Sequence, residues 1–388
     1  MDRADLTPGA ARALGLLALA LVLSMATWFS ASAVVPQLRD EWDLSSNAAA
    51  WLTIAVQLGF VVGALASSLT TAADVIPPHV VVFWGAIGAA AANVAIVAVH
   101  GPAAAIPLRF ATGFFLAGVY PPALKLMATW FRRGRGTALG ILVGALTLGS
   151  ALPHLVNGLG GLDWQVVIVV TSALTVLGGA VALVAVPEGP YPFPAAKFDP
   201  HQARLVFANR RVRLTSFGYY GHMWELYAMW AWFLVFARDS LFSSASAAAL
   251  VTFAVIAAGA IGCVVGGLLG DRIGRPETTV AFLACSGVCA LVVGLLPTWA
   301  AVLVGIVWGF AVIGDSAQFS TLVTEYADQA YVGTALALQL AFGFTLTVAT
   351  IWLIPVFEHA VGWAWAFAFL VPGPVVGIAA MLRLRANR

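Results

Sequence analysis

Runs of about twenty apolar residues recur along the whole 388-residue chain, and they constrain the fold more than any other feature. A helix needs about 20 mostly apolar residues to cross the roughly 30 Å hydrocarbon core of a bilayer. Each run is therefore a candidate membrane-spanning helix, because a helix satisfies its own backbone hydrogen bonds in lipid. Twelve runs lie at about residues 13–35, 48–70, 79–100, 103–130, 137–158, 165–187, 214–237, 247–269, 279–296, 299–323, 333–356 and 363–382.

The composition supports the same conclusion. Hydrophobic residues make up 61% of the chain and charged residues 9%, whereas a soluble domain carries roughly 25% charged residues. No soluble fold of this length buries enough apolar surface. The composition excludes a soluble enzyme, a nucleic-acid-binding domain and a disordered protein. We expect a lipid bilayer as the surrounding partner, no nucleic acid, and a monomer.

One long polar break divides the twelve runs into six and six. It predicts an amino-terminal six-helix bundle at 1–187, a cytoplasmic central loop at 188–213 and a carboxy-terminal six-helix bundle at 214–388. Thirteen to fifteen Lys and Arg residues fall on the side of the termini and two or three on the other side. Because cytoplasmic loops carry the excess of Lys and Arg, we expect a multi-pass protein of the inner or plasma membrane with both termini in the cytoplasm.

The two halves resemble each other in sequence. Gly113-Phe114 and Gly118 in the fourth span match Gly309-Phe310 and Gly314 in the tenth span. A Gly-Thr-Ala-Leu stretch begins at Gly136 before the fifth span and again at Gly333 before the eleventh. Internal repeats of this kind are typical of secondary transporters, whose substrate site lies at the interface between the repeats.

The loop after the eighth span carries the strongest motif. It reads Gly267-Leu-Leu-Gly-Asp271-Arg272-Ile-Gly274-Arg275. Gly267 allows close helix approach and Gly274 a tight turn. Asp271 can pair with an Arg or with a helix N-terminus and so latch two helices together. We interpret the five residues Gly267, Asp271, Arg272, Gly274 and Arg275 as a cytoplasmic gate.

This loop resembles the G-x-x-x-D-R-x-G-R signature of the major facilitator superfamily, and the similarity in organisation extends to the whole chain. The resemblance implies an all-α membrane fold of 12 transmembrane helices in two pseudo-symmetric six-helix bundles. It also implies transport by rocking of the two bundles. The corresponding loop of the first half, from Gly63 to Asp74, lacks the Asp-Arg pair, so we expect a weaker latch there.

The fourth span begins Arg109-Phe-Ala-Thr-Gly113-Phe-Phe-Leu-Ala117. It resembles the R-x-x-x-G-x-x-x-A pattern of many proton-coupled members of the superfamily. Arg109, Gly113 and Ala117 share one helix face. Arg109 is a candidate to hold an anionic substrate or to interact with a carboxylate, and the alternative is an interfacial side chain that extends toward water.

The seventh span carries the most unusual polar residues. Glu225 lies near the predicted bilayer midplane, where an ionisable side chain is costly and marks a functional candidate. His222 is one turn away on the same face and can share a proton or hydrogen bond with Glu225. Tyr219 lies one turn earlier. The alternative is a structural His–Glu pair that bridges to another helix.

Four further polar residues complete the candidate substrate and ion site. Asp315 and Gln318 belong to the tenth span, and we expect Asp315 to be a proton site or a partner of Arg109 or Lys125. Tyr120 precedes Pro121-Pro122, which break the fourth span at the place that matches Gly314 and Asp315. Gln339 in the eleventh span either faces the cavity or bonds a neighbouring helix.

No enzyme motif accompanies these residues. The sequence has no P-loop, no H-E-x-x-H, no nucleophile elbow and no metal-ligand cluster, so we expect neither a cofactor nor catalysis. The sequence therefore predicts a secondary active transporter, driven by protons, for a small organic anion or a compact amphipathic solute. Alternatives are a proton-driven efflux antiporter, a uniport facilitator and a non-transporting assembly factor or receptor.

The branch of the superfamily is a further question. The seventh and eleventh spans look broadly like those of the cyanate and nitrate/nitrite porters. Nitrate porters usually have an Arg in each of spans two and eight, and here those spans carry none. This difference argues against nitrate as the substrate.

Overall fold

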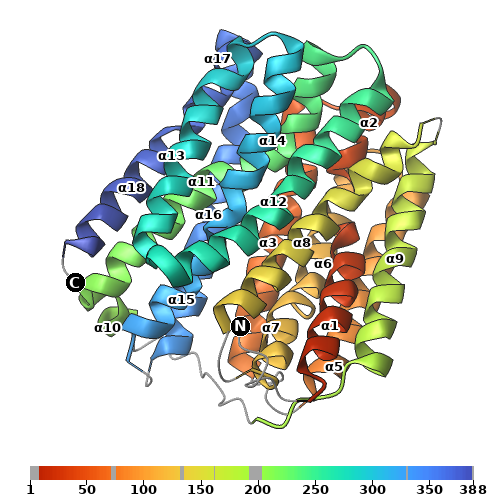
Figure 1. The fold of residues 1–388 in the computed structure, drawn as a ribbon. Coiled ribbons are helices and arrows are strands. Elements are labelled where there is room, and N and C mark those ends of the chain that lie inside the picture. The colour runs from red at the N-terminus through yellow and green to blue at the C-terminus, as the bar shows by residue number, and fades with distance from the viewer. Residues whose placement is uncertain are drawn as a thin grey trace.

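The computed structural model describes residues 8–70, 76–131, 135–160, 162–191, 203–328 and 331–386, and most of them form long, roughly parallel helices (Figure 1). The first half contains α1 Ala10–Ser24, α2 Val35–Trp42, α3 Ser46–Thr70, α5 Pro78–Val94, α6 Pro102–Leu116, α7 Tyr120–Ala128, α8 Arg135–Gly158 and α9 Trp164–Ala185. The second half contains α10 Ala203–Ala208, α11 Arg210–Phe236, α12 Ala245–Ile273, α13 Arg275–Val292, α14 Thr298–Gly314, α15 Ser316–Tyr326, α16 Val332–Val361, α17 Trp363–Ala366 and α18 Pro372–Arg385.

Twelve crossings account for these helices. Within the described residues, 11 helices or helix pairs are long and apolar enough to span a membrane. The remaining long helix is α11, whose His222, Glu225, Tyr and Trp side chains lower its hydropathy. Nearly all of α11 from Gly221 to Phe236 is nevertheless buried, because it runs between other helices rather than along lipid. The predicted count of twelve helices is thus consistent with the structure.

The two halves lie side by side, with α1–α9 on one side and α11–α18 on the other (Figure 1). Helices α8 and α12 run together across the junction, and α3 and α16 form the second contact between the halves. Both termini lie at the same end of the bundle, which we call the terminal end; the other end is the distal end. This is the architecture that the sequence predicted, although the domain boundaries at 187 and 213 stay a prediction.

Equivalent helix contacts in the two halves confirm the internal repeat. Gly113 of α6 lies so close to α3 that a Cβ atom would collide with the backbone carbonyl of Val56. Gly309 of α14 lies against Val255 of α12 in the same way. A second set of close contacts repeats this correspondence: Gly63 with Phe114, and Gly262 with Phe310. Small residues allow such close helix packing in a membrane, where no water drives association.

Helix breaks also repeat. The fourth crossing is divided into α6 and α7 immediately before Tyr120, where Pro121 and Pro122 interrupt the helical hydrogen bonds. The tenth crossing is divided into α14 and α15 at Asp315. The sequence predicted the first of these breaks, whereas the break at Asp315 was not predicted.

The first crossing differs from the prediction. A continuous span was predicted at 13–35, but α1 ends at Ser24 and is followed by short 3₁₀ turns at Met25–Thr27 and Ser32–Val34. The short helix α2 then extends the chain at the distal end. The apolar run could not reveal this break, because it contains no Gly or Pro between Gly15 and Pro36.

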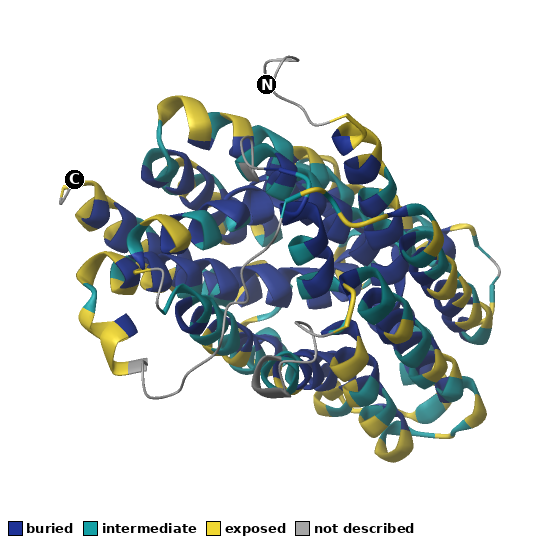
Figure 2. Ribbon diagram, turned by 90° about the horizontal axis from the view of Figure 1, so that it is seen from below, coloured by how far each residue is buried: buried dark blue, intermediate teal, exposed yellow. Residues whose placement is uncertain are grey.

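Burial separates the interior from the lipid-facing surface. Buried residues gather toward the middle of the bundle and exposed ones toward its periphery (Figure 2). Large apolar side chains such as Trp84, Val184 and Leu303 are exposed on that periphery, as expected for a surface that contacts lipid.

Parts of the predicted loops lie outside the described residues. These are Asp74, Arg132 and Arg133, and residues 192–202 of the predicted central loop, including Lys197.

Candidate functional site

Glu225 is held in the interior of the second half by α11. The side chain of Asn209 accepts hydrogen bonds from the backbone of Arg211 and Val212 and so starts this helix. Four turns later the Glu225 carboxyl is 1% exposed. One oxygen accepts a 2.6 Å bond from Trp308 Nε1 and the other a 2.9 Å bond from Ser286 Oγ. Both donors are neutral, so no opposite charge among these partners compensates an ionised Glu225.

His222 and Asp315 form a second buried group beside Glu225. His222 Nδ1 lies 2.9 Å from Asp315 Oδ1, and both side chains are at most 1% exposed. Asp315 occupies the break between α14 and α15, where the helix turn allows its side chain to meet α11. The pair joins the seventh and tenth crossings within the second half.

These partners differ from the expected ones. The sequence suggested a contact between His222 and Glu225, but the partner of His222 is Asp315, and Glu225 bonds Ser286 and Trp308. Asp315 was expected to pair with Arg109 or Lys125, and its close approach is instead to His222. The three ionisable residues therefore belong to one cluster on two helices. We call Glu225, His222 and Asp315 the α11–α14 acid cluster.

Arg109 is fully buried in the first half, and protein acceptors occupy all three of its nitrogens. Nε donates to Leu52 O at 3.2 Å, and Nη1 donates to Thr27 O at 2.9 Å and to Asn93 Oδ1 at 2.8 Å. Nη2 donates to the carbonyl of Trp28. The carbonyls of Thr27 and Trp28 are available because α1 has ended, which frees carbonyls at its C-terminus.

Asn93 extends this network to the next helix. Its amide nitrogen donates to Ser172 Oγ at 3.0 Å, and Arg109 is thereby connected to the segment after α1 and to α3, α5 and α9. Arg109 is therefore neither interfacial nor directed toward Asp315. The arrangement makes it a cross-link within the first half rather than a free cation that meets a solute.

The gate residues meet at the terminal end. Arg275 Nε donates to Glu325 Oε1 at 2.9 Å, and its Nη2 lies 3.4 Å from Asp271 Oδ1. Asp271 also faces the start of α8, since a Cβ atom on Gly136 would lie 3.3 Å from its Oδ1. A carboxylate is favourable at a helix N-terminus. Asp271 therefore lies at the junction between the halves, and its role as a gate stays a prediction.

The remaining gate residues behave differently from one another. Gly274 has a φ of 104°, a backbone conformation that favours glycine, and it separates α12 from α13. Gly267 is buried against the backbone of Gly136 and Thr137. Arg272 is exposed.

Gln318 belongs to this gate rather than to the acid cluster. Its Oε1 accepts a 3.0 Å bond from Arg275 Nη1, and its Nε2 donates to Gly266 O at 3.0 Å. Its expected role in a substrate or ion site stays a prediction. The break at Asp315 restarts the helix, so the face of α15 cannot be extrapolated from that of α14.

Tyr219, Tyr120 and Gln339 lie on three different helices, α11, α7 and α16. The Tyr219 ring is 6.0 Å from the ring of His222 and 5.8 Å from that of Phe319. Tyr120 is half-buried at the first residue of α7. Gln339 is buried, and its Nε2 has no hydrogen-bond partner within the described residues. These three residues do not define a binding site by themselves.

Comparison with known proteins decides the family. The profile of the Major Facilitator Superfamily matches residues 17–349, which is most of the chain. The chain belongs to the Major Facilitator Superfamily. Proteins of this superfamily are transporters, so the buried polar groups described above belong to a transporter fold.

The curated relatives match the chain at low identity and over only part of its length. The chain is 28% identical over 162 residues to a putative transporter, YdfJ, of Escherichia coli, covering 37% of this chain and 38% of YdfJ. It is 31% identical over 144 residues to the ectoine/proline transporter ProP of Corynebacterium glutamicum, covering 32% of this chain and 29% of ProP. The chain thus matches between 29% and 38% of the length of these curated relatives. None of the matches specifies the cyanate or nitrate/nitrite branch.

A solved superfamily structure has the same fold. It is the crystal structure of a bacterial homologue of the human lysosomal transporter Spinster, inward-facing and unoccupied. The TM-score is 0.68 with 15% sequence identity, and the alignment covers 98% of this chain and 96% of the other. At this identity the similarity concerns the fold alone.

The two partners of Glu225 and a set of aromatic residues were not predicted from the sequence. Trp308 lies seven residues before Asp315 and so shares its helix face, which was a usable signal. Ser286 is a small residue between two cysteines, and nothing in the sequence marked it as a partner of Glu225. Trp28 and Phe60 of the first half contact Tyr227 and Phe344 of the second. Such contacts depend on how the halves pack.

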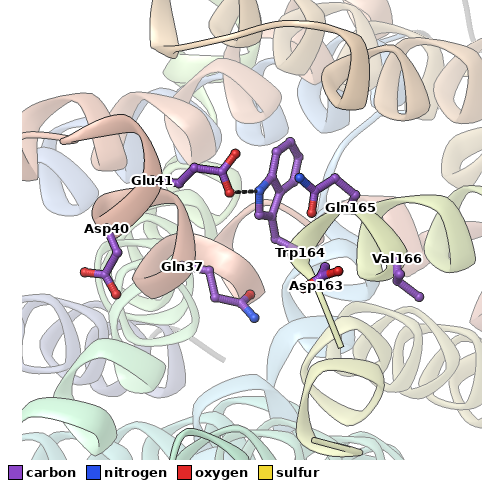
Figure 3. A pocket seen from close by; sticks show the side chains of 7 residues that line it. All are labelled: Gln37, Asp40, Glu41, Asp163, Trp164, Gln165 and Val166. Carbon is purple, nitrogen blue, oxygen red and sulfur yellow. Dashed lines mark hydrogen bonds between the residues drawn. The ribbon is translucent and has the colours of Figure 1, made fainter. Parts of the chain in front are cut away.

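A separate hollow lies at the distal end of the superfamily fold. Its volume is about 690 Å³, and Figure 3 shows its lining from α2 and the start of α9. The Trp164 indole donates a 2.6 Å bond to Glu41 there. Its lining residues are Gln37, Asp40, Glu41, Asp163, Trp164, Gln165 and Val166. None of the predicted site residues lines it, so this hollow is not the predicted substrate site.

Proposed function

We propose that this protein is a proton-coupled secondary active transporter that moves a small solute across the cell membrane by alternating access. The terminal end faces the cytoplasm in this proposal, because Lys and Arg of the short loops gather there. The two halves rock about the junction formed by α8 with α12 and α3 with α16, and a monomer suffices for this motion.

The observation that carries the proposal is the buried acid cluster. Glu225 has two neutral partners and no cation among them, while His222 and Asp315 share one short contact. An ionised carboxyl in such surroundings is costly, whereas a protonated one is not. The free-energy cost of burying such a group depends on its protonation. Protonation can therefore shift the equilibrium between two conformations of the transporter, which is the requirement for coupling.

The hydrogen bonds of Arg109 argue against an anionic solute that binds to its guanidinium group. The sequence favoured a small organic anion because Arg109 could bind it, but the protein's own acceptors use the nitrogens of Arg109. A solute carboxylate would therefore bind neutral donors. The ectoine and proline named for the Corynebacterium relative are the first solutes to test.

The coupling is tested with Glu225→Gln, which keeps shape and hydrogen-bond acceptance at one oxygen but cannot release a proton. Proteoliposomes that enclose a pH-sensitive dye receive ectoine, proline, other amino acids, carboxylates, sugars and amine drugs in turn. We expect one class to change the internal pH with wild type, and E225Q to lose that change. Solute entry by symport acidifies the interior, whereas entry by exchange for protons makes it alkaline.

Glu358→Gln is the matched control, because Glu358 lies at the distal end of α16 outside the acid cluster. It should behave as wild type. Solute movement with an unchanged proton signal in E225Q would contradict coupling through Glu225. Solute movement with no proton signal in wild type would identify a uniport facilitator instead.

A further inference from the structure

Six aromatic rings from both halves meet in the interior of the bundle. They are Trp28, Phe29, Phe60, Tyr227, Trp230 and Phe344, which we call the central aromatic cluster. Trp28 follows α1 and is 6.1 Å from Tyr227 of α11 and 6.0 Å from Phe344 of α16, measured between ring centroids. All six side chains are buried. The cluster thus joins the first and seventh crossings at the junction that must open during transport.

Polar atoms at this cluster lack partners within the described residues. They are the indole N–H groups of Trp28 and Trp230 and both amide atoms of Gln57, which lies one turn before Phe60 on α3. The three side chains are at most 1% exposed. Buried polar groups in proteins nearly always have hydrogen-bond partners. Their concentration here points to a ligand that supplies an acceptor, such as a carboxylate.

Charge is distributed unequally around the cluster. On the side of the first half, the Arg109 guanidinium donates to the carbonyl of Trp28. On the side of the second half, Glu225 precedes Tyr227 by two residues on α11, and Asp315 lies beyond it against His222. The six rings themselves carry no charge. A solute with a net charge would remain uncompensated there, whereas a dipolar solute would align with this field.

We propose that the central aromatic cluster binds a compact zwitterion that carries a carboxylate and a substituted ammonium group. The carboxylate faces the first half and accepts from Trp28 Nε1 and Gln57. The ammonium group lies against the rings of Tyr227, Trp230 and Phe344, since aromatic faces attract cations. The rings contact one another in this structure, so the solute replaces ring–ring contacts when the halves separate. This inference rests on the proposed transport function and specifies its solute.

Three molecules of similar shape separate the two charges. Glycine betaine carries both charges, 3,3-dimethylbutyrate replaces its nitrogen by carbon and keeps the carboxylate, and choline keeps the ammonium group and lacks the carboxylate. Isothermal titration of the purified full chain gives the three affinities. We expect glycine betaine to bind at least about tenfold more tightly than either isostere, because each isostere loses one of the two interactions.

Substitutions then assign the interactions to residues. Trp28→Phe keeps an aromatic ring and removes the N–H, so it should weaken glycine betaine several-fold and change choline little. Tyr227→Leu removes a ring and should weaken both. Trp84→Phe is the matched control, because Trp84 is exposed on the periphery, and it should leave all three affinities unchanged. Gln57→Leu removes the other proposed carboxylate donor and provides a second test, with the same expected pattern, if W28F is not stable.

The outcomes separate this inference from the proposed function. The zwitterion proposal is overturned if either isostere binds as tightly as glycine betaine. It is also overturned if a sugar or a simple carboxylate binds more tightly than glycine betaine. Equal weakening of all three molecules by W28F overturns the assigned orientation. None of these results affects the dye assay with E225Q, which measures proton coupling for whichever solute moves.

Discussion

Replacement of Arg109 distinguishes a structural cross-link from a solute-binding residue. In the structure, hydrogen bonds from its three nitrogens reach Leu52, Thr27, Asn93 and Trp28. Arg109→Ala removes these bonds and leaves several buried acceptors unpaired. Each bond to a charged donor contributes about 1.5–3 kcal/mol, and losses within one network do not add fully. We therefore expect a destabilisation of about 4 kcal/mol.

Arg109→Lys should recover only part of this loss. Lysine has one nitrogen with three N–H groups and cannot reach acceptors on α3, on α5 and in the segment after α1 together. We expect a cost of about 2–3 kcal/mol. By the entropy of unfolding per residue, 4 kcal/mol lowers the thermal midpoint of a chain of this size by about 5 °C. Thermal unfolding of the detergent-solubilised protein, followed by tryptophan fluorescence, measures this shift.

A control and a double substitution sharpen the test. Arg385→Ala removes a 62% exposed side chain that pairs with Glu277, and such pairs contribute little, so its midpoint should stay near that of wild type. Asn93→Ala combined with Arg109→Ala should cost clearly less than the sum of the two single changes. An R109A variant with an unchanged midpoint and lost affinity for a small organic anion would refute the structural role.

Two further predictions concern helix packing and the gate. Gly113→Ala and Gly309→Ala should each lower the thermal midpoint, because the added Cβ meets the backbone of Val56 or Val255. Gly15→Ala is the control and should not lower it, because open space surrounds Gly15. An unchanged midpoint in G309A would contradict the structural repeat. At the terminal end, Arg275→Ala should lower the midpoint more than Asp271→Asn, since Arg275 also bonds Glu325 and Gln318 and Asp271 is 42% exposed, and the opposite order would contradict the gate geometry.

Much of the fold could be predicted because membrane helices carry strong local signals. Length and apolarity located the crossings, and paired motifs such as those at Gly113 and Gly309 indicated the repeat that the packing confirms. The break before Tyr120 could be predicted because Pro121 and Pro122 act on their own helix. The early end of α1 at Ser24 could not, because no residue of that run marks it.

The partners of the buried polar residues could not be predicted in the same way. Glu225 and His222 were expected to pair because they are one turn apart, yet their partners come from α13, α14 and the break at Asp315. Arg109 was expected to face a solute or a carboxylate, and it bonds carbonyls that are free to accept because α1 has ended. Local periodicity identifies which residues are buried, whereas their partners depend on helix phase and on breaks elsewhere in the chain.

The two halves hold their buried charges in different ways, and in the proposed mechanism this difference places the coupling step in the second half. Arg109 keeps its charge in proteins and has protein acceptors at every nitrogen, so it gives the first half one stable arrangement. Glu225, Asp315 and His222 can each change protonation, and they lie on α11 or at the break that follows α14. A proton that enters or leaves therefore changes the cost of burial in the second half. Because Tyr227 belongs to the same helix as Glu225, that change acts on the helix that contributes to the central aromatic cluster. We expect α11 to respond to protons while the Arg109 network keeps the first half fixed.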